Sequence, residues 1–191
     1  LWASGTTLYW QTTAVGASVP GAIGGTVTDT YIPIATAGDT LGDFLPAYVD
    51  LTTDKNVFFG VVPASIEAGA NYNTAIGYLA MENVEAGNGN TAVGMNAAND
   101  ITDSYASVYV GYAAGGFNTT GSRNVFVGYA AGASDIASDN VAVGVYAAYA
   151  MTGNSNVVVG SDAGYNATGT TGSIYIVKAA GRYTQGTYNV F

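Results

Sequence analysis

The chain has 191 residues, of which only 9% are charged, and its net charge is −9. It contains neither cysteine nor histidine, which excludes disulfides, cysteine- or histidine-based zinc sites, cysteine nucleophiles and a Ser-His-acid triad. The acidic balance disfavours nucleic acid and anionic membranes as partners, and no apolar run approaches the roughly 18 residues that cross a bilayer. We therefore expect no nucleic-acid partner and no membrane insertion. Abundant glycine with few prolines, 27 against 4, predicts tightly turned, all-β structure.

Residues 1–55 show no repeat. The stretch "LWASGTTLYWQTT" alternates in the manner of a strand, and "GASVPGAIGGTV" is rich in turn-forming residues. Pro33 and Pro46 favour short or edge strands. We interpret residues 1–55 as an irregular β-rich connector or cap, which would protect the open sheet edge of the neighbouring repeat region.

Residues 56–191 repeat a five-residue pattern, Asn-apolar-x-apolar-Gly, which we call a rung. Rungs begin at residues 56, 73, 90, 107, 124, 140, 156, 173 and 189, so consecutive rungs are 16 or 17 residues apart. Serine replaces the asparagine at two rungs, and Val177 replaces one glycine. Such a period predicts a parallel β-solenoid or β-roll of 16–17-residue coils, with about eight to nine rungs.

Each rung glycine is followed, three residues later in most coils, by an alanine, and then by a polar loop that absorbs the one-residue length differences. Stacked asparagines can bond to neighbouring rungs, and a glycine at the strand end can adopt the positive φ of a corner. We interpret both columns as structural rather than as ligand sites. They are Asn56, Asn73, Asn90, Asn124, Asn140 and Asn156, with Gly60, Gly77, Gly94, Gly111, Gly128, Gly144 and Gly160.

The two faces of the strands are both apolar. The first and third positions after the asparagine, such as Val125 and Val127, are nearly all β-branched, and we expect them to form the core of the coil. The middle position points the other way, so we expect it to face neighbouring copies of the chain. This predicted intersubunit face comprises Phe58, Ala75, Ala92, Tyr109, Phe126, Ala142, Val158 and Tyr175.

The units "NTAIGYLA" (73–80), "NTAVGMNA" (90–97), "NVFVGYAA" (124–131) and "NVAVGVYA" (140–147) resemble the NTAVGxxA repeats of trimeric autotransporter adhesin heads and of phage tail fibres. The resemblance covers residues 56–191 and implies a homotrimer, intertwined or side by side. Adhesin head repeats are typically shorter than these coils, which favours the phage fibre.

Candidate catalytic and metal-binding residues are few. The acids Glu82 with Glu85, Asp100 with Asp103, and Asp135 with Asp139 could form pairs, and four aspartates lie in the connector: Asp39, Asp43, Asp50 and Asp54. A glycan-cleaving fibre would need two opposed carboxylates, but solubility charges explain these acids more simply. Calcium is an alternative without a recognised binding motif. We predict no enzyme activity, no metal and no cofactor.

Several tyrosines recur just after the rung glycine, including Tyr78, Tyr112 and Tyr129. They could stack along the fibre or present flat faces to sugars, and packing is the favoured interpretation. The expected function is a structural shaft of a trimeric phage tail fibre, located in the virion. Its expected partners are itself, other tail or fibre proteins and a host surface glycan or protein receptor. The alternatives are a bacterial surface adhesin and a carbohydrate-binding or carbohydrate-cleaving fibre domain.

Overall fold

The computed structural model describes residues 2–4, 7–9, 30–31, 47–49, 55–60, 65–66, 69–134 and 137–191. This part of the chain is all-β, and no helix occurs in it. The turn-rich stretch and both prolines named for the connector lie outside the described residues. The strand of each of the first eight rungs lies within them.

The described N-terminal strands are short and antiparallel. β1 and β2 pair as a hairpin within the stretch that alternates in sequence, and β3 and β4 extend the main sheet by antiparallel pairing onto β5. These four strands are β1 (Trp2–Ser4), β2 (Thr7–Tyr9), β3 (Thr30–Tyr31) and β4 (Ala47–Val49).

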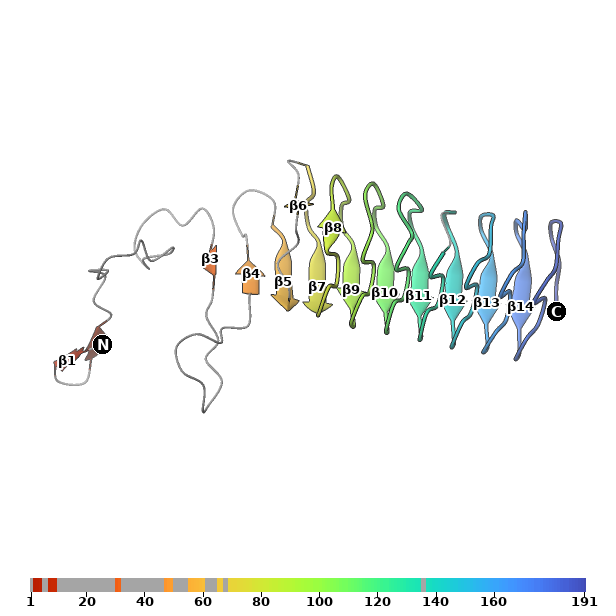
Figure 1. Cartoon of the computed structure of the whole chain (residues 1–191). Helices are drawn as coiled ribbons and strands as arrows, with labels where there is room; N and C mark the ends of the chain where they lie inside the picture. The colour runs from red at the N-terminus through yellow and green to blue at the C-terminus, as the bar shows by residue number, and fades with distance from the viewer. Residues whose placement is uncertain are drawn as a thin grey trace.

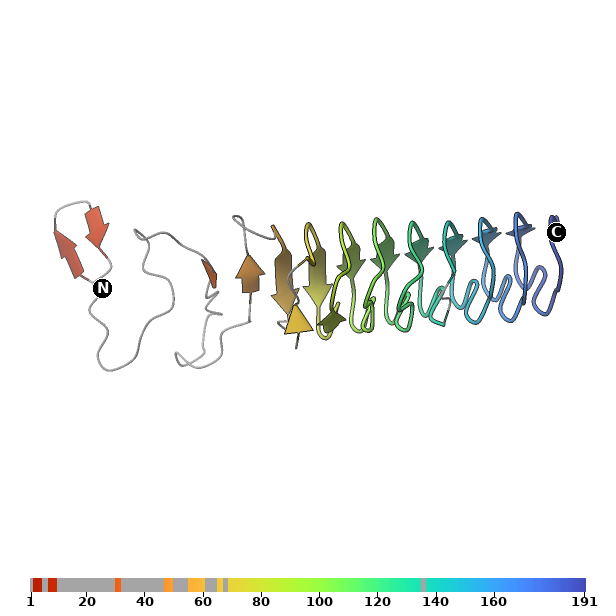
Figure 2. The same ribbon diagram turned by 90° about the horizontal axis from the view of Figure 1, so that it is seen from above.

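The repeat region forms a parallel β-solenoid, as predicted. Each rung contributes one strand, and each strand pairs in parallel with the strand of the next coil without a shift in register, for example Tyr109 with Phe126. Figure 1 shows these strands side by side in one row and pointing the same way, and Figure 2 shows the coils stacked along a single axis. The strands are β5 (Val57–Gly60), β7 (Thr74–Gly77), β9 (Thr91–Val93), β10 (Val108–Val110), β11 (Val125–Val127), β12 (Val141–Val143), β13 (Val157–Val159) and β14 (Ile174–Ile176). A second parallel pair joins β6 (Ser65–Ile66) to β8 (Asn83–Val84).

The rung glycines turn the chain out of the strand, as the sequence predicted. Gly77 has φ +137°, and a Cβ built there would lie 2.6 Å from the carbonyl oxygen of Gly94 in the next coil. Both the conformation and the close stacking therefore exclude a side chain. Val177 occupies the same place with φ +112°, an unfavourable conformation for a β-branched residue.

The core of the coil is built from the middle strand position, which reverses the prediction for the two faces. All eight residues that we expected to contact other subunits are buried inside their own coil: Phe58, Ala75, Ala92, Tyr109, Phe126, Ala142, Val158 and Tyr175. The first and third positions, predicted to be core, point outward; Ile76, for example, is 44% exposed. The interior of the coil is too narrow to bury both the first and the third residue of each strand. The single middle residue already reaches the opposite wall of the coil, so two side chains would not fit there.

Within a coil, the middle residue and the residue six positions later fill a common space. Three large middle residues face a glycine: a Cβ added at Gly115, Gly132 or Gly181 would overlap the ring of Tyr109, Phe126 or Tyr175, respectively. Where the middle residue is an alanine, another large side chain of the same coil lies in the interior. Met81, Ile101 and Met151 are such side chains, and all three are fully buried. Each coil therefore reaches close packing by its own combination of sizes.

The rung asparagines form an internal ladder of hydrogen bonds, in which Ser107 and Ser173 take two of the positions. Nδ2 of Asn124 donates to the carbonyl oxygen of Ala137 at 2.8 Å, which links the beginning and the end of one coil. Oδ1 of the same residue accepts a hydrogen bond of 2.8 Å from the backbone N–H of Asn140, which links that coil to the next. The same pairs of contacts recur at Asn56, Asn73, Asn90, Asn140 and Asn156. The structural interpretation of this column is thus supported by complete pairing of its buried amide groups.

Candidate functional site: an outward apolar face

The outer surface of the main sheet carries three columns of residues, which we call the outward face. They are the first and third positions of each strand, which point away from the core, and the residue after the rung glycine, which lies at the corner just beyond the strand. The first column is Val57, Thr74, Thr91, Val108, Val125, Val141, Val157 and Ile174. The second is Phe59, Ile76, Val93, Val110, Val127, Val143, Val159 and Ile176, and the third is Tyr78, Met95, Tyr112, Tyr129, Val145, Ser161 and Lys178.

This face is apolar and nearly uncharged. None of its described residues is buried, and many large apolar side chains on it are exposed, including Val125, Val143, Val159 and Ile176. Lys178, at the C-terminal end of the third column, is the one charged residue among these positions. A continuous exposed apolar surface of this extent is typical of an interaction site.

Charged side chains lie at one edge of the outward face, just before three of the rungs: Lys55, Arg123 and Asp139. The Arg123 guanidinium binds Asp139 through Nε at 2.6 Å and Nη2 at 2.8 Å, and its Nη1 donates to the Tyr105 hydroxyl at 3.0 Å. The bidentate hydrogen bonds from Arg123 hold the pKa of Asp139 below its usual range. Nearer the N-terminus, Nζ of Lys55 donates to the Tyr72 hydroxyl at 3.1 Å.

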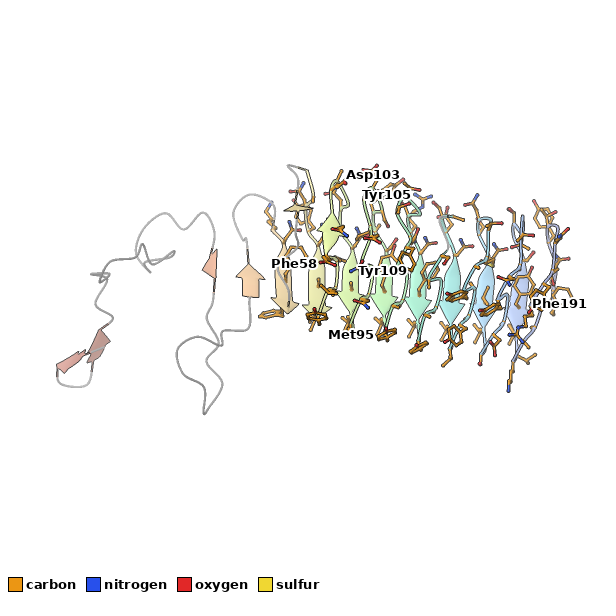
Figure 3. All side chains as sticks on the ribbon, viewed as in Figure 1. Phe58, Met95, Asp103, Tyr105, Tyr109 and Phe191 are labelled. Atoms are coloured by element: carbon orange, nitrogen blue, oxygen red, sulfur yellow. The ribbon has the colours of Figure 1, made fainter. Side chains whose placement is uncertain are left out.

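Aromatic side chains gather at the opposite edge of the face. The rings of Tyr112 and Tyr129 are stacked with centroids 4.9 Å apart, and Tyr146 meets Tyr129 edge-on at 5.3 Å. A hydrogen bond with Tyr129 is the main cause that raises the pKa of Tyr146. Figure 3 places Met95 at this edge and Tyr105 at the other. The stacked rings cover each other's flat sides, which favours packing over sugar binding.

Three of the candidate acids in the described part of the chain are held by side chains of neighbouring coils. Glu82 accepts a hydrogen bond of 3.0 Å from Nδ2 of Asn99, and Asp100 accepts one from Asn83. Asp139 is held by Arg123, and no group of three or more acids lies close enough among the described residues to hold a metal ion. Asp135 and the four connector aspartates lie outside the described residues.

Sequence reasoning identified the rung columns but misassigned the outward face. A signal was present: the rung asparagine, the middle position and the rung glycine alternate along the strand and so share one side. An asparagine ladder inside the coil therefore places the middle residue inside as well.

Comparison with protein-family models, curated proteins and solved structures finds no match to this chain. Within the described residues, no helix has the length and apolar character needed to cross a membrane. The fold, with its internal ladder of hydrogen bonds, is accordingly the structural observation on which a function can be based.

Proposed function

We propose that the chain is a rigid structural segment of a homotrimeric phage tail fibre, in which it positions a receptor-binding end for adsorption to the host. The observation that carries this proposal is the internal ladder of rung side chains, asparagine at most rungs and serine at Ser107 and Ser173. Each rung asparagine closes its own coil, and the asparagine or serine of one rung accepts a hydrogen bond from the next, through groups that water does not reach. A rod held in this way resists bending and local opening, because the buried amide groups of the ladder have no water with which to exchange their partners.

The dimensions suit a spacer. With about 4.8 Å between neighbouring parallel strands, nine rungs extend about 40 Å along the axis. The one-residue differences in coil length leave the pairing of β11 with β12 in register, with Val125 opposite Val141. Length can therefore be set by the number of coils without a change of cross-section.

The phage assignment rests on the resemblance of the NTAVGxxA units, and its runner-up is the head of a bacterial surface adhesin. Antibodies raised against the purified chain should decorate tail fibres in electron micrographs of virions from its source. If the antibodies label the bacterial cell surface and do not label the virions, the phage assignment is overturned in favour of the adhesin.

The mechanical part of the proposal has its own test. Cryo-electron microscopy of the assembled chain should show straight rods of parallel coils around a threefold axis at subnanometre resolution. Bent or collapsed particles would contradict a role as a rigid spacer.

A further inference from the structure

The outward face has the composition of a protein interface rather than of a solvated surface. Its 23 described positions are valine, isoleucine, phenylalanine, tyrosine, methionine, threonine, one serine and one lysine. Interfaces place aromatic and methionine side chains in an apolar centre and surround them with polar groups. Polar groups lie at two places along one edge: the Arg123 and Asp139 pair, and Lys55 beside Tyr72 nearer the N-terminus.

The extent of the face also matches an interface. A stable complex of ordinary size uses about 20–30 residues from each partner. The 23 described positions of the outward face fall in this range. In-register pairing of β5 to β14 joins the first two columns into one continuous surface, and the third column borders it at the corners of the coils. A smaller patch would be normal for a solvated protein surface, whereas this one runs along the whole described row of coils.

We infer that the outward face is covered by the same face of further copies of this chain, lying alongside with their axes parallel. The face repeats once per strand, so a partner must carry apolar ridges at the same spacing to fill it along its length. A second copy meets this requirement because its strands have the same period. Charge points the same way: a chain of net charge −9 approaches its copies with least repulsion where it carries no acid, and none lies in the three columns.

This inference deepens the proposed function. It rests on that function in one respect only, namely that the fibre contains several copies of the chain. It assigns the contact to Val127 and Val143 and their column, not to the middle positions that the sequence suggested. The outward side chains lie outside the packed interior of the coil, so the contact can be tested without unfolding the solenoid.

The test compares two double variants of the whole chain by analytical ultracentrifugation. The first, Val127→Lys with Val143→Lys, places two charges at the centre of the face. The second, Thr120→Lys with Thr168→Lys, adds the same charge at exposed residues outside the three columns. We expect the unaltered chain and the Thr120/Thr168 variant to sediment as oligomers. The Val127/Val143 variant should be monomeric, with an unchanged far-ultraviolet circular dichroism spectrum.

Disulfide trapping provides a second measurement, because the chain has no cysteine of its own. Under mild oxidation, Val127→Cys should give covalent dimers from a preassembled sample, and Thr120→Cys should give none. A monomeric unaltered chain would overturn the inference. So would a Val127/Val143 variant that keeps the oligomeric state of the unaltered chain.

The two proposals can fail separately. If virions are labelled but the Val127/Val143 variant stays oligomeric, the fibre assignment stands and the contact lies elsewhere. If the variant dissociates but virions are not labelled, the contact stands and the phage assignment fails.

Discussion

The ring of Tyr109 occupies the space that any side chain at position 115 would need, and residue 115 is a glycine. A Cβ at Gly115 would overlap Cδ1 and Cε1 of that ring, which is fully buried in the same coil. Gly132 and Phe126 repeat the relationship in the next coil. The size of the middle strand residue is thus matched to a residue six positions later, across the interior of one coil.

The match predicts that Gly115→Ala is much more damaging than the same change at Gly169. The two glycines have nearly the same φ, +60° and +63°, but Gly169 has no atom within 4 Å of an added Cβ. Both variants bear the cost of a left-handed alanine, and only Gly115→Ala adds overpacking, of about 1–3 kcal/mol. Chemical denaturation of both variants measures the difference. Equal losses of unfolding free energy would show that the overlap is relieved at no cost.

The asparagine ladder predicts different outcomes for Asn124→Ala and Asn124→Ser. Alanine removes the hydrogen bonds that Asn124 makes with the backbone N–H of Asn140 and the carbonyl of Ala137, each worth about 0.5–1.5 kcal/mol. Serine keeps an acceptor for the N–H, as Ser107 Oγ does for Asn124 at 3.0 Å. Thermal unfolding should therefore place the serine variant between the original chain and the alanine variant. The ladder would lose its proposed role if alanine were tolerated as well as serine.

Two buried tyrosines predict opposite effects of removing a hydroxyl. The Tyr109 hydroxyl lies 2.9 Å from Ser104 Oγ and accepts from Asn118 Nδ2 at 3.1 Å, whereas the buried Tyr175 hydroxyl has no hydrogen-bond partner. Tyr109→Phe should lower the free energy of unfolding by about 1 kcal/mol or more, and Tyr175→Phe should leave it unchanged or raise it. Denaturation of the two single variants decides the matter, and equal destabilisation by both would contradict it.

The Arg123–Asp139 pair predicts a local dependence on pH. The pKa of Asp139 is lowered in the folded chain, so the pair stabilises the fold above the ordinary aspartate value of about 3.9. This contribution is lost as the pH falls through the lower folded value. Carbon-13 NMR titration should show the Asp139 pKa rising toward the ordinary value in Arg123→Gln. The control Lys178→Gln, which removes an equal charge elsewhere, should leave it unchanged.

The sequence alone predicted the rung strands, their order and the corners that follow them. The recurrence of an asparagine and a glycine four residues apart located the spans found as β7, β9 and β11, and it placed the positive φ at Gly77 and Gly94. These features depend on local chemistry. A glycine conformation and an asparagine amide are read from residue type and spacing without knowledge of what lies opposite.

Tertiary structure decided which face of each strand is inside. Alternation along a strand separates two faces but does not orient them when both are apolar, as with Phe126 on one side and Val125 and Val127 on the other. The two faces are oriented by the opposite wall of the coil. At Gly132, which follows Phe126 by six residues, this wall leaves room for one inward side chain. That volume belongs to the closed coil and not to any short stretch of sequence, because it exists only when strand and turn are packed together.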